Sequence, residues 1–308
     1  MDMYQKRKQR KEKREQNIEE SKGCTSVNIN WYPGHMVKAQ REIKESLKLI
    51  DVVVEIVDSR IPFSSQNPVV GELVEGKKKI VVLNKIDLAD LEMVSKAEAK
   101  FKAEGTYTAR LDANSGKGIK ELLVLIEKVG KSVYDEKNSK LPNPIVRALI
   151  MGIPNVGKST VINKLSNKNS AKVGNKPGVT VKKQWIRVGS NLELLDTPGI
   201  LWPNLSDKDA GLKLALTGNI KQEILDSEEL CIAGIEELLK VEKYKKMLVE
   251  KYKLEESDLE VEQTFEIMDA IGKKRGCLLP RGLINYEKVA TIFLDDLKNG
   301  RIGRISFE

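Results

Sequence analysis

The chain has 308 residues, 32% charged side chains and a formal net charge of +8, so it exceeds the usual size of one domain and we expect two. Its three cysteines, Cys24, Cys231 and Cys277, share no C-x-x-C spacing, which argues against a disulfide framework and favours free thiols in the cytoplasm. No apolar run approaches about 20 residues and no apolar signal region follows the charged N-terminus, so we expect neither membrane insertion nor export.

The positive charge is concentrated in the first part of the chain. Residues 1–204 hold 36 basic and 24 acidic side chains, whereas residues 205–308 hold 17 and 21. Residues 1–26 are rich in lysine and arginine and have almost no large apolar side chains, which predicts a tail that cannot bury a core. Over residues 36–50, apolar side chains recur at helical spacing with basic side chains on another face, which predicts an amphipathic helix.

Apolar runs of strand length recur in the middle of the chain, mostly with helical segments between them. They occupy residues 52–57, 80–83, 145–151 and 192–195. Such runs are typical of the buried strands of a largely parallel α/β sheet. A further strand is predicted over residues 184–188, joined to the last run by the turn signal Gly189-Ser190-Asn191.

Beyond Trp202-Pro203 the pattern changes to helical segments without strand-like runs, for example over residues 230–246. We therefore predict an α/β domain over residues 27–204, followed by an all-α C-terminal domain over residues 205–308.

A glycine-rich loop follows the strand at 145–151 and precedes a helical run. Its sequence is Gly152-Ile153-Pro154-Asn155-Val156-Gly157-Lys158-Ser159. In this context backbone N–H groups wrap the phosphates of a nucleotide, Lys158 neutralises the β and γ phosphates, and the Ser159 hydroxyl ligates magnesium. Phosphate contacts are expected from Asn155, Val156, Gly157, Lys158, Ser159 and Thr160.

The motif Asp196-Thr197-Pro198-Gly199 closes the next strand. The Asp196 carboxylate can hold a magnesium-bound water, and the Gly199 N–H can reach the γ-phosphate. Thr180 lies between the two motifs and can supply a second hydroxyl. We therefore predict a magnesium site formed by Ser159, Thr180 and Asp196.

The motif Asn84-Lys85-Ile86-Asp87 follows the strand at 80–83 and predicts guanine selectivity. Asp87 can accept two hydrogen bonds from the guanine N1–H and N2–H2 groups, Asn84 braces the loop, and Lys85 covers the base face. In ordinary GTPases this motif comes after the phosphate loop, but here it precedes it. The inverted order predicts a circularly permuted P-loop GTPase domain.

Three further motifs complete a family pattern: Trp31-Tyr32-Pro33-Gly34-His35-Met36, Asp58-Ser59-Arg60-Ile61-Pro62 and Pro177-Gly178-Val179-Thr180. With the motifs above, the sequence resembles the ribosome biogenesis GTPase A family (RbgA, also called YlqF) from about Asn30 onward. The resemblance implies GTP hydrolysis coupled to late assembly of the large ribosomal subunit. It also implies that the partners are the subunit precursor and its rRNA, bound by the C-terminal domain.

Several residues depart from the usual GTPase pattern. Asp112-Ala113-Asn114 stands where a Ser-Ala-Lys-like base loop is expected, so base contact there rests on the Ala113 backbone. Ile200 replaces a water-orienting glutamine, and the family resemblance implies that His35, the only histidine, acts in hydrolysis. From the phosphate-loop motif, we expect Lys158 to be the second catalytic residue. Asn155 resembles the asparagine that holds potassium in cation-activated GTPases.

Two other functions compete with this interpretation. One is a nucleotide-switched rRNA-binding module whose slow hydrolysis only resets it. The other is a permuted GTPase of the small subunit, a class that commonly carries a zinc module. Three scattered cysteines and one histidine cannot build that module, so we expect no zinc.

Overall fold

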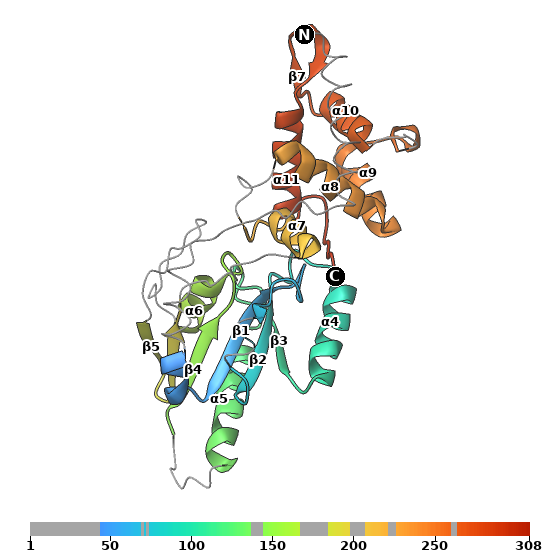
Figure 1. The fold of residues 1–308 in the computed structure, drawn as a ribbon. Coiled ribbons are helices and arrows are strands. Elements are labelled where there is room, and N and C mark those ends of the chain that lie inside the picture. Colours follow the sequence, from blue (N-terminus) through green and yellow to red (C-terminus); the bar gives the residue numbers. More distant parts are fainter. Residues whose placement is uncertain are drawn as a thin grey trace.

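The computed structural model describes residues 44–68, 71, 74–136, 144–166, 184–197, 207–220, 226–259 and 264–308. A sheet with flanking helices forms one part of the molecule, and a group of helices forms the other (Figure 1). No helix within these ranges is both long and apolar enough to cross a membrane.

Six strands form one sheet in the order β3-β2-β1-β4-β6-β5. Neighbouring strands are parallel except for the antiparallel hairpin of β5 and β6. The strands are β1 (Val52–Asp58), β2 (Lys78–Asn84), β3 (Tyr107–Arg110), β4 (Val146–Met151), β5 (Gln184–Val188) and β6 (Leu192–Asp196). The predicted α/β sheet is confirmed, and each predicted apolar run forms a strand.

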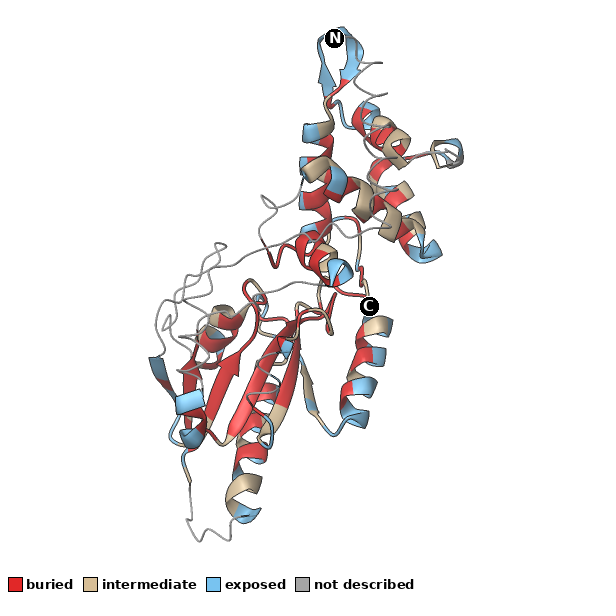
Figure 2. Cartoon of the chain, viewed as in Figure 1, coloured by how far each residue is buried: buried red, intermediate tan, exposed pale blue. Residues whose placement is uncertain are grey.

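The central strands are buried because helices cover the sheet (Figure 2). Every residue of β1 is buried, and its apolar side chains alternate between one large cluster and two smaller ones. Val54 and Ile56 pack with α5 (Ile119–Glu136), whereas Val57 belongs to the cluster of α4 (Leu91–Ala103). The continuous apolar pattern of β1 therefore reflects burial on both of its faces.

Strand β3 does not follow from the sequence pattern. Its four residues are exposed or half-buried, so they lack the apolar run that marks the other strands. It pairs with β2, and its Thr108 and Arg110 side chains donate to the Glu98 carboxylate of α4 at 3.0 and 2.8 Å. The tertiary contacts of this edge strand decide its conformation.

The C-terminal part is helical, as predicted, and also contains a short hairpin. Its helices are α7 (Lys208–Leu216), α8 (Ser227–Leu239), α9 (Glu242–Tyr252), α10 (Thr264–Lys274) and α11 (Tyr286–Lys298). Strands β7 (Leu278–Leu279) and β8 (Leu283–Ile284) flank the 3-10 turn η4 (Pro280–Gly282), and a further turn, η3, spans Glu256–Asp258. Two-residue strands are too short to give a period-2 pattern, which is why the sequence predicts only helices here.

The segment 230–246, predicted to be helical, contains a break. Helix α8 ends at Leu239 and α9 begins at Glu242, because Val241 has an extended backbone with φ −119° and ψ 115°. The apolar periodicity continues across this break, so the pattern alone does not reveal it.

Of the helix predicted over residues 36–50, only residues from 44 onward are described. They include the 3-10 turn η1 (Leu47–Leu49), and Leu47 and Ile50 pack beside β1 and β4. The rest of this helix and the predicted tail at 1–26 lie outside the described residues.

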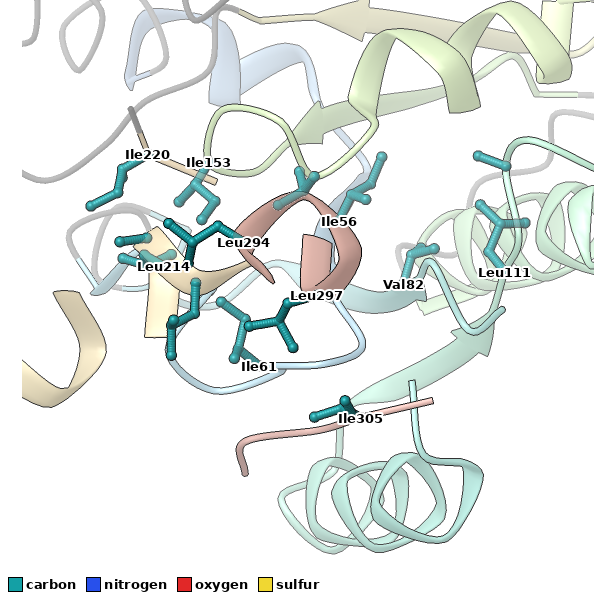
Figure 3. Close-up of a cluster of buried hydrophobic side chains, with 14 of the residues drawn as sticks. Ile56, Ile61, Val82, Leu111, Ile153, Leu214, Ile220, Leu294, Leu297 and Ile305 are labelled. Atoms are coloured by element: carbon teal, nitrogen blue, oxygen red, sulfur yellow. The ribbon is translucent and has the colours of Figure 1, made fainter. Parts of the chain in front are cut away.

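One hydrophobic core spans the sheet and the C-terminal helices. Ile56 and Ile153 at the sheet share a buried cluster with Leu214 of α7 and Leu297 of α11 (Figure 3). The last residues of the sequence return to the sheet, where the Phe307 N–H donates to the Arg60 carbonyl at 2.8 Å. The C-terminal helices therefore pack against the carboxyl ends of the parallel strands.

Candidate nucleotide-binding site

The carboxyl ends of four neighbouring strands bring the predicted motifs together. Strand β1 ends at Asp58, β2 at Asn84, β4 leads into Gly152, and β6 ends at Asp196. In an open parallel sheet, ligands bind at the carboxyl ends of the strands, near the point where the strand order reverses. Sequence order places these segments apart, but the sheet order β2-β1-β4-β6 makes them neighbours.

Two glycines of the phosphate loop are required by their surroundings. Gly152 has φ +146°, and a Cβ atom there would lie 2.4 Å from the Ile56 carbonyl oxygen. Gly157 has φ +98°, and a Cβ atom there would lie 2.4 Å from Asn84 Nδ2. The loop therefore packs against β1 and the guanine motif as closely as backbone alone allows. Helix α6 (Lys158–Ser166) begins at the lysine of this motif, so the N-terminus of the helix faces the loop.

Lys158 is held inside the phosphate loop. Its side chain is 7% exposed, and its Nζ donates to the Ile153 carbonyl at 2.9 Å. Burial lowers the pKa of Lys158 to about 8, although the neighbouring Asp196 carboxylate opposes that shift. The ammonium group is thus desolvated, and it lies within the loop that is predicted to bind phosphate.

Asp196 is a buried acid whose carboxylate oxygens are incompletely satisfied by the protein. In the described part of the chain, neither carboxylate oxygen has a hydrogen-bond partner of normal geometry. Burial raises the pKa of Asp196 to about 6, even though Lys158 favours the ionised form. A hard cation such as magnesium prefers oxygen ligands of this kind, and Ser159 at the start of α6 offers a second. These side chains fit a magnesium site.

Asn84 joins the phosphate loop to the base loop. Its Nδ2 donates to the Val156 carbonyl at 2.7 Å, and its Oδ1 accepts the Ala113 N–H at 3.1 Å. Both groups are buried, so the single carboxamide fixes the spacing of the two loops. The Ala113 N–H is engaged by Asn84 in this structure, and base contact by the Ala113 backbone stays a prediction.

Asp87 is the last residue of the guanine motif and is the acid predicted to bind the base. Its side chain is only half-buried, but its Oδ1 atom is buried and has no partner among the residues described. Burial raises the pKa of Asp87, and the nearby Asp112 carboxylate adds to that effect. Asp112 is itself satisfied, because it accepts the N–H groups of Asn114 and Ser115 at 3.0 and 3.2 Å. Asp87 is therefore the acid left to receive a donor edge such as that of guanine.

Lys85 is tied to an acid that the sequence motifs did not assign to the site. It has φ +62°, and its Nζ donates to Asp58 Oδ2 at 2.8 Å. Arg60 Nη2 donates to the same oxygen at 2.7 Å. Burial alone would raise the pKa of Asp58, but Arg60 and Lys85 together hold it well below its usual range. The sequence marked the Asp58–Pro62 segment as a family motif, but only the fold shows that Asp58 pairs with Lys85.

Asn155 also reaches the C-terminal part of the molecule. It has φ +59°, and its Nδ2 donates to the Gly218 carbonyl at 3.1 Å. Its predicted role in holding potassium stays a prediction. Three other predicted site residues, His35, Thr180 and Gly199, lie outside the described residues.

The chain is similar in sequence to known GTPases. Residues 147–270 match the family model described as "50S ribosome-binding GTPase". The chain is 46% identical over 281 residues to Ribosome biogenesis GTPase A of Bacillus cereus, covering 91% of this chain and 93% of that protein. It is 32% identical over 281 residues to the protein of that name from Thermotoga maritima, covering 91% and 94%.

The fold is also similar to that of two solved YlqF structures. A GDP-bound YlqF superposes with a TM-score of 0.58 and 29% identity, covering 87% of this chain and 98% of that one. A GNP-bound YlqF from T. maritima gives the same score and identity over 88% and 97%. The predicted family and GTPase class are thereby confirmed. With its guanine motif ahead of its phosphate loop, and relatives that match over nearly the whole length, this chain belongs to the ribosome biogenesis GTPase A family.

Proposed function

We propose that this chain hydrolyses GTP during late maturation of the large ribosomal subunit, in the cytoplasm, with the subunit precursor and its rRNA as partners. One observation carries the chemical part of the proposal. Asp196 and Asp87 are acids with buried oxygens that lack a hydrogen-bond partner of normal geometry among the described residues, and Asp196 lies near the Lys158 ammonium. Magnesium and guanine would supply the missing partners. The ribosomal part rests on family membership.

Ser159, Asp196 and Thr180 are proposed to hold magnesium. When bound there, magnesium would offset the negative charge of the phosphates during hydrolysis. Lys158 would stabilise the same charge from within the loop, because its ammonium is desolvated and already fixed on the Ile153 carbonyl. Asn155 is proposed to hold a potassium ion that adds positive charge beside the phosphates.

His35 is proposed to position or deprotonate the attacking water, because Ile200 cannot form a hydrogen bond with it. We expect His35→Ala to reduce subunit-stimulated turnover by about 10²–10⁴-fold, the usual effect of losing a general base. GTP affinity and subunit binding should be retained, since Lys158 and Asp87 are unchanged. Full stimulated turnover in His35→Ala would assign the water to another group.

Multiple-turnover assays with and without large subunits test the proposed reaction. We expect large subunits to accelerate GTP hydrolysis, with small subunits as the matched control. Sedimentation with large subunits should depend on whether GTP, GDP or a non-hydrolysable analogue is present. Nucleotide-dependent sedimentation with no acceleration would favour the alternative of an rRNA-binding module that hydrolysis only resets.

The basic residues 1–26 test the rRNA part of the proposal. Each lysine or arginine that contacts a phosphate releases counterions, so binding should weaken as salt rises. We expect deletion of residues 1–26 to flatten that salt dependence while nucleotide-dependent binding persists. If the deletion abolished all subunit binding, the C-terminal domain would not be the principal contact.

A further inference from the structure

A three-residue turn after α7 contacts the phosphate loop and the residues at the end of β1. The Thr217 carbonyl accepts Arg60 Nη2 at 2.8 Å, and the Gly218 carbonyl accepts Asn155 Nδ2 at 3.1 Å. Asn219 Nδ2 donates to Asp58 Oδ2 at 3.1 Å. We call Thr217–Asn219 the junction turn. Consecutive residues of the C-terminal part thus reach the phosphate loop and the acid that holds Lys85.

The contacts of the junction turn are buried. Asp58 and Asn219 are fully buried, and Arg60 is 3% exposed. Asp58 Oδ2 accepts from Arg60, Lys85 and Asn219 together, so the position of Lys85 depends in part on Asn219, which the C-terminal part supplies. Low local dielectric strengthens each of these bonds and makes the loss of one costly.

Arg60 also caps two helices of the C-terminal part. Its Nη2 donates to Thr217, the C-cap of α7, and its Nη1 donates to the carbonyl of Lys298, the last residue of α11, at 3.0 Å. Helix C-termini carry unsatisfied carbonyls and partial negative charge, which a guanidinium group satisfies well. Arg60, which shares Asp58 with Lys85 of the guanine motif, is therefore bonded to the ends of both helices.

We propose that the junction turn couples guanine-nucleotide occupancy to the docking of α7 and α11, with Arg60 and Asn219 as positioning residues for Lys85. The base loop and the phosphate loop are occupied in both GDP and GTP complexes. The coupling therefore reports whether a guanine nucleotide is bound, whether or not a γ-phosphate is present. It is distinct from the segment after Asp196, whose predicted contact is the γ-phosphate.

Amide hydrogen exchange in the unaltered protein tests this coupling. The informative amides are Gly218 and Asn219, which donate to Ala215 and Leu214 at 3.1 and 2.9 Å, and Arg301 beyond α11. We expect GDP and a non-hydrolysable GTP analogue to slow their exchange equally, by roughly 5–150-fold, the usual range for coupled sites. Slowing by the analogue alone would overturn the proposal, as would equal slowing throughout α10, which indicates global stabilisation.

Matched variants test the reciprocal effect on affinity. Asn219→Ala removes one amide-to-carboxylate bond at the junction turn. Asn299→Ala removes a comparable bond to Asp295, at 2.8 Å, on the exposed end of α11. Coupling is reciprocal, so Asn219→Ala should weaken binding of GDP and of the GTP analogue by the same factor, about fivefold or more. Asn299→Ala should bind both as the unaltered protein does.

A loss confined to the triphosphate, or equal affinities in the two variants, would overturn the proposal. Circular dichroism establishes that Asn219→Ala is folded. If it is not, Arg60→Lys replaces it, because an ammonium keeps the charge beside Asp58 but lacks the planar fork that reaches two helix ends. The same equal loss for GDP and the analogue is expected, and unchanged affinity would count against the junction turn.

Discussion

Asp58 and Asp196 are two buried acids at the ends of strands β1 and β6, yet their surroundings differ completely. Asp58 has Arg60, Lys85 and Asn219 as partners, and its pKa lies well below the usual range. Asp196 has no partner of normal geometry in the described ranges, and burial raises its pKa to about 6. A buried charge must be paired by the protein or by something the protein binds. Asp58 is therefore a structural acid that holds parts of the fold together, whereas Asp196 is a candidate ligand-binding acid.

The comparison predicts its largest effect at Arg60. Arg60→Ala leaves Asp58 buried with fewer partners, so we expect the free energy of unfolding to fall by about 3–5 kcal/mol. Arg147→Ala is the control, since its bond to Glu193 at 3.1 Å lies at a half-exposed surface and should contribute at most about 1 kcal/mol. Urea unfolding measures both. Equal losses would remove the distinction between the two environments.

The next effect concerns the pH dependence caused by Asp196. Its pKa is raised from 3.8 to about 6 in the folded protein, so the folded state binds the proton more tightly than the unfolded state. The resulting stabilisation is complete below pH 3.8 and is lost as the pH rises through about 6. A shift of this size corresponds to at most about 3 kcal/mol.

Asp196→Asn should remove the loss of stability between pH 3.8 and about 6, and it should abolish magnesium-dependent turnover. Unfolding free energies of the two proteins, compared at intervals between pH 4 and 7 without nucleotide, measure it. Parallel pH profiles would mean that Asp196 is paired in solution. Asp58 has the opposite sign, since its lowered pKa means that its contribution is lost only as the pH falls below 3.8.

Asp87, like Asp196, has a buried oxygen without a hydrogen-bond partner among the described residues. Its substitution should therefore change nucleotide selectivity more than the stability of the fold. Asp87→Asn should lower GTP affinity by about 1.5–3 kcal/mol, the usual contribution of hydrogen bonds to a charged group. Xanthosine triphosphate should bind better than GTP, because the amide can donate to its added carbonyl. Competition binding measures the preference. Unchanged GTP preference would place guanine recognition elsewhere.

The smallest effect distinguishes two neighbouring serines. Ser65 Oγ accepts the Asp58 N–H at 3.0 Å and donates to the Ile61 carbonyl at 2.6 Å, so Ser65→Ala should cost about 1–3 kcal/mol. Ser59 Oγ is buried, and the described residues provide it no partner. Ser59→Ala should therefore be neutral or slightly stabilising. A larger loss from Ser59→Ala than from Ser65→Ala in thermal unfolding would contradict the comparison.

The sequence by itself determined the family and every strand of the sheet except β3, and it predicted the residues of the nucleotide-binding motifs. Long apolar runs reveal strands buried on both faces, and the motif order reveals the permutation. These signals are local in the chain, because a phosphate loop needs its glycines and lysine within eight positions. Strand β3 and the break before α9 escaped, because an exposed edge strand and a single extended Val241 leave the local pattern unchanged.

Only the tertiary structure decided which charged residues act together. Asp58 and Asn219 are 161 positions apart in sequence, and Asn155 and Gly218 are 63 apart. No local pattern records such pairings, since each depends on how helices α7 and α11 pack against the ends of β1 and β4. Whether a buried acid is saturated like Asp58 or incompletely satisfied like Asp196 follows from that packing, because the partners come from elements distant in the chain.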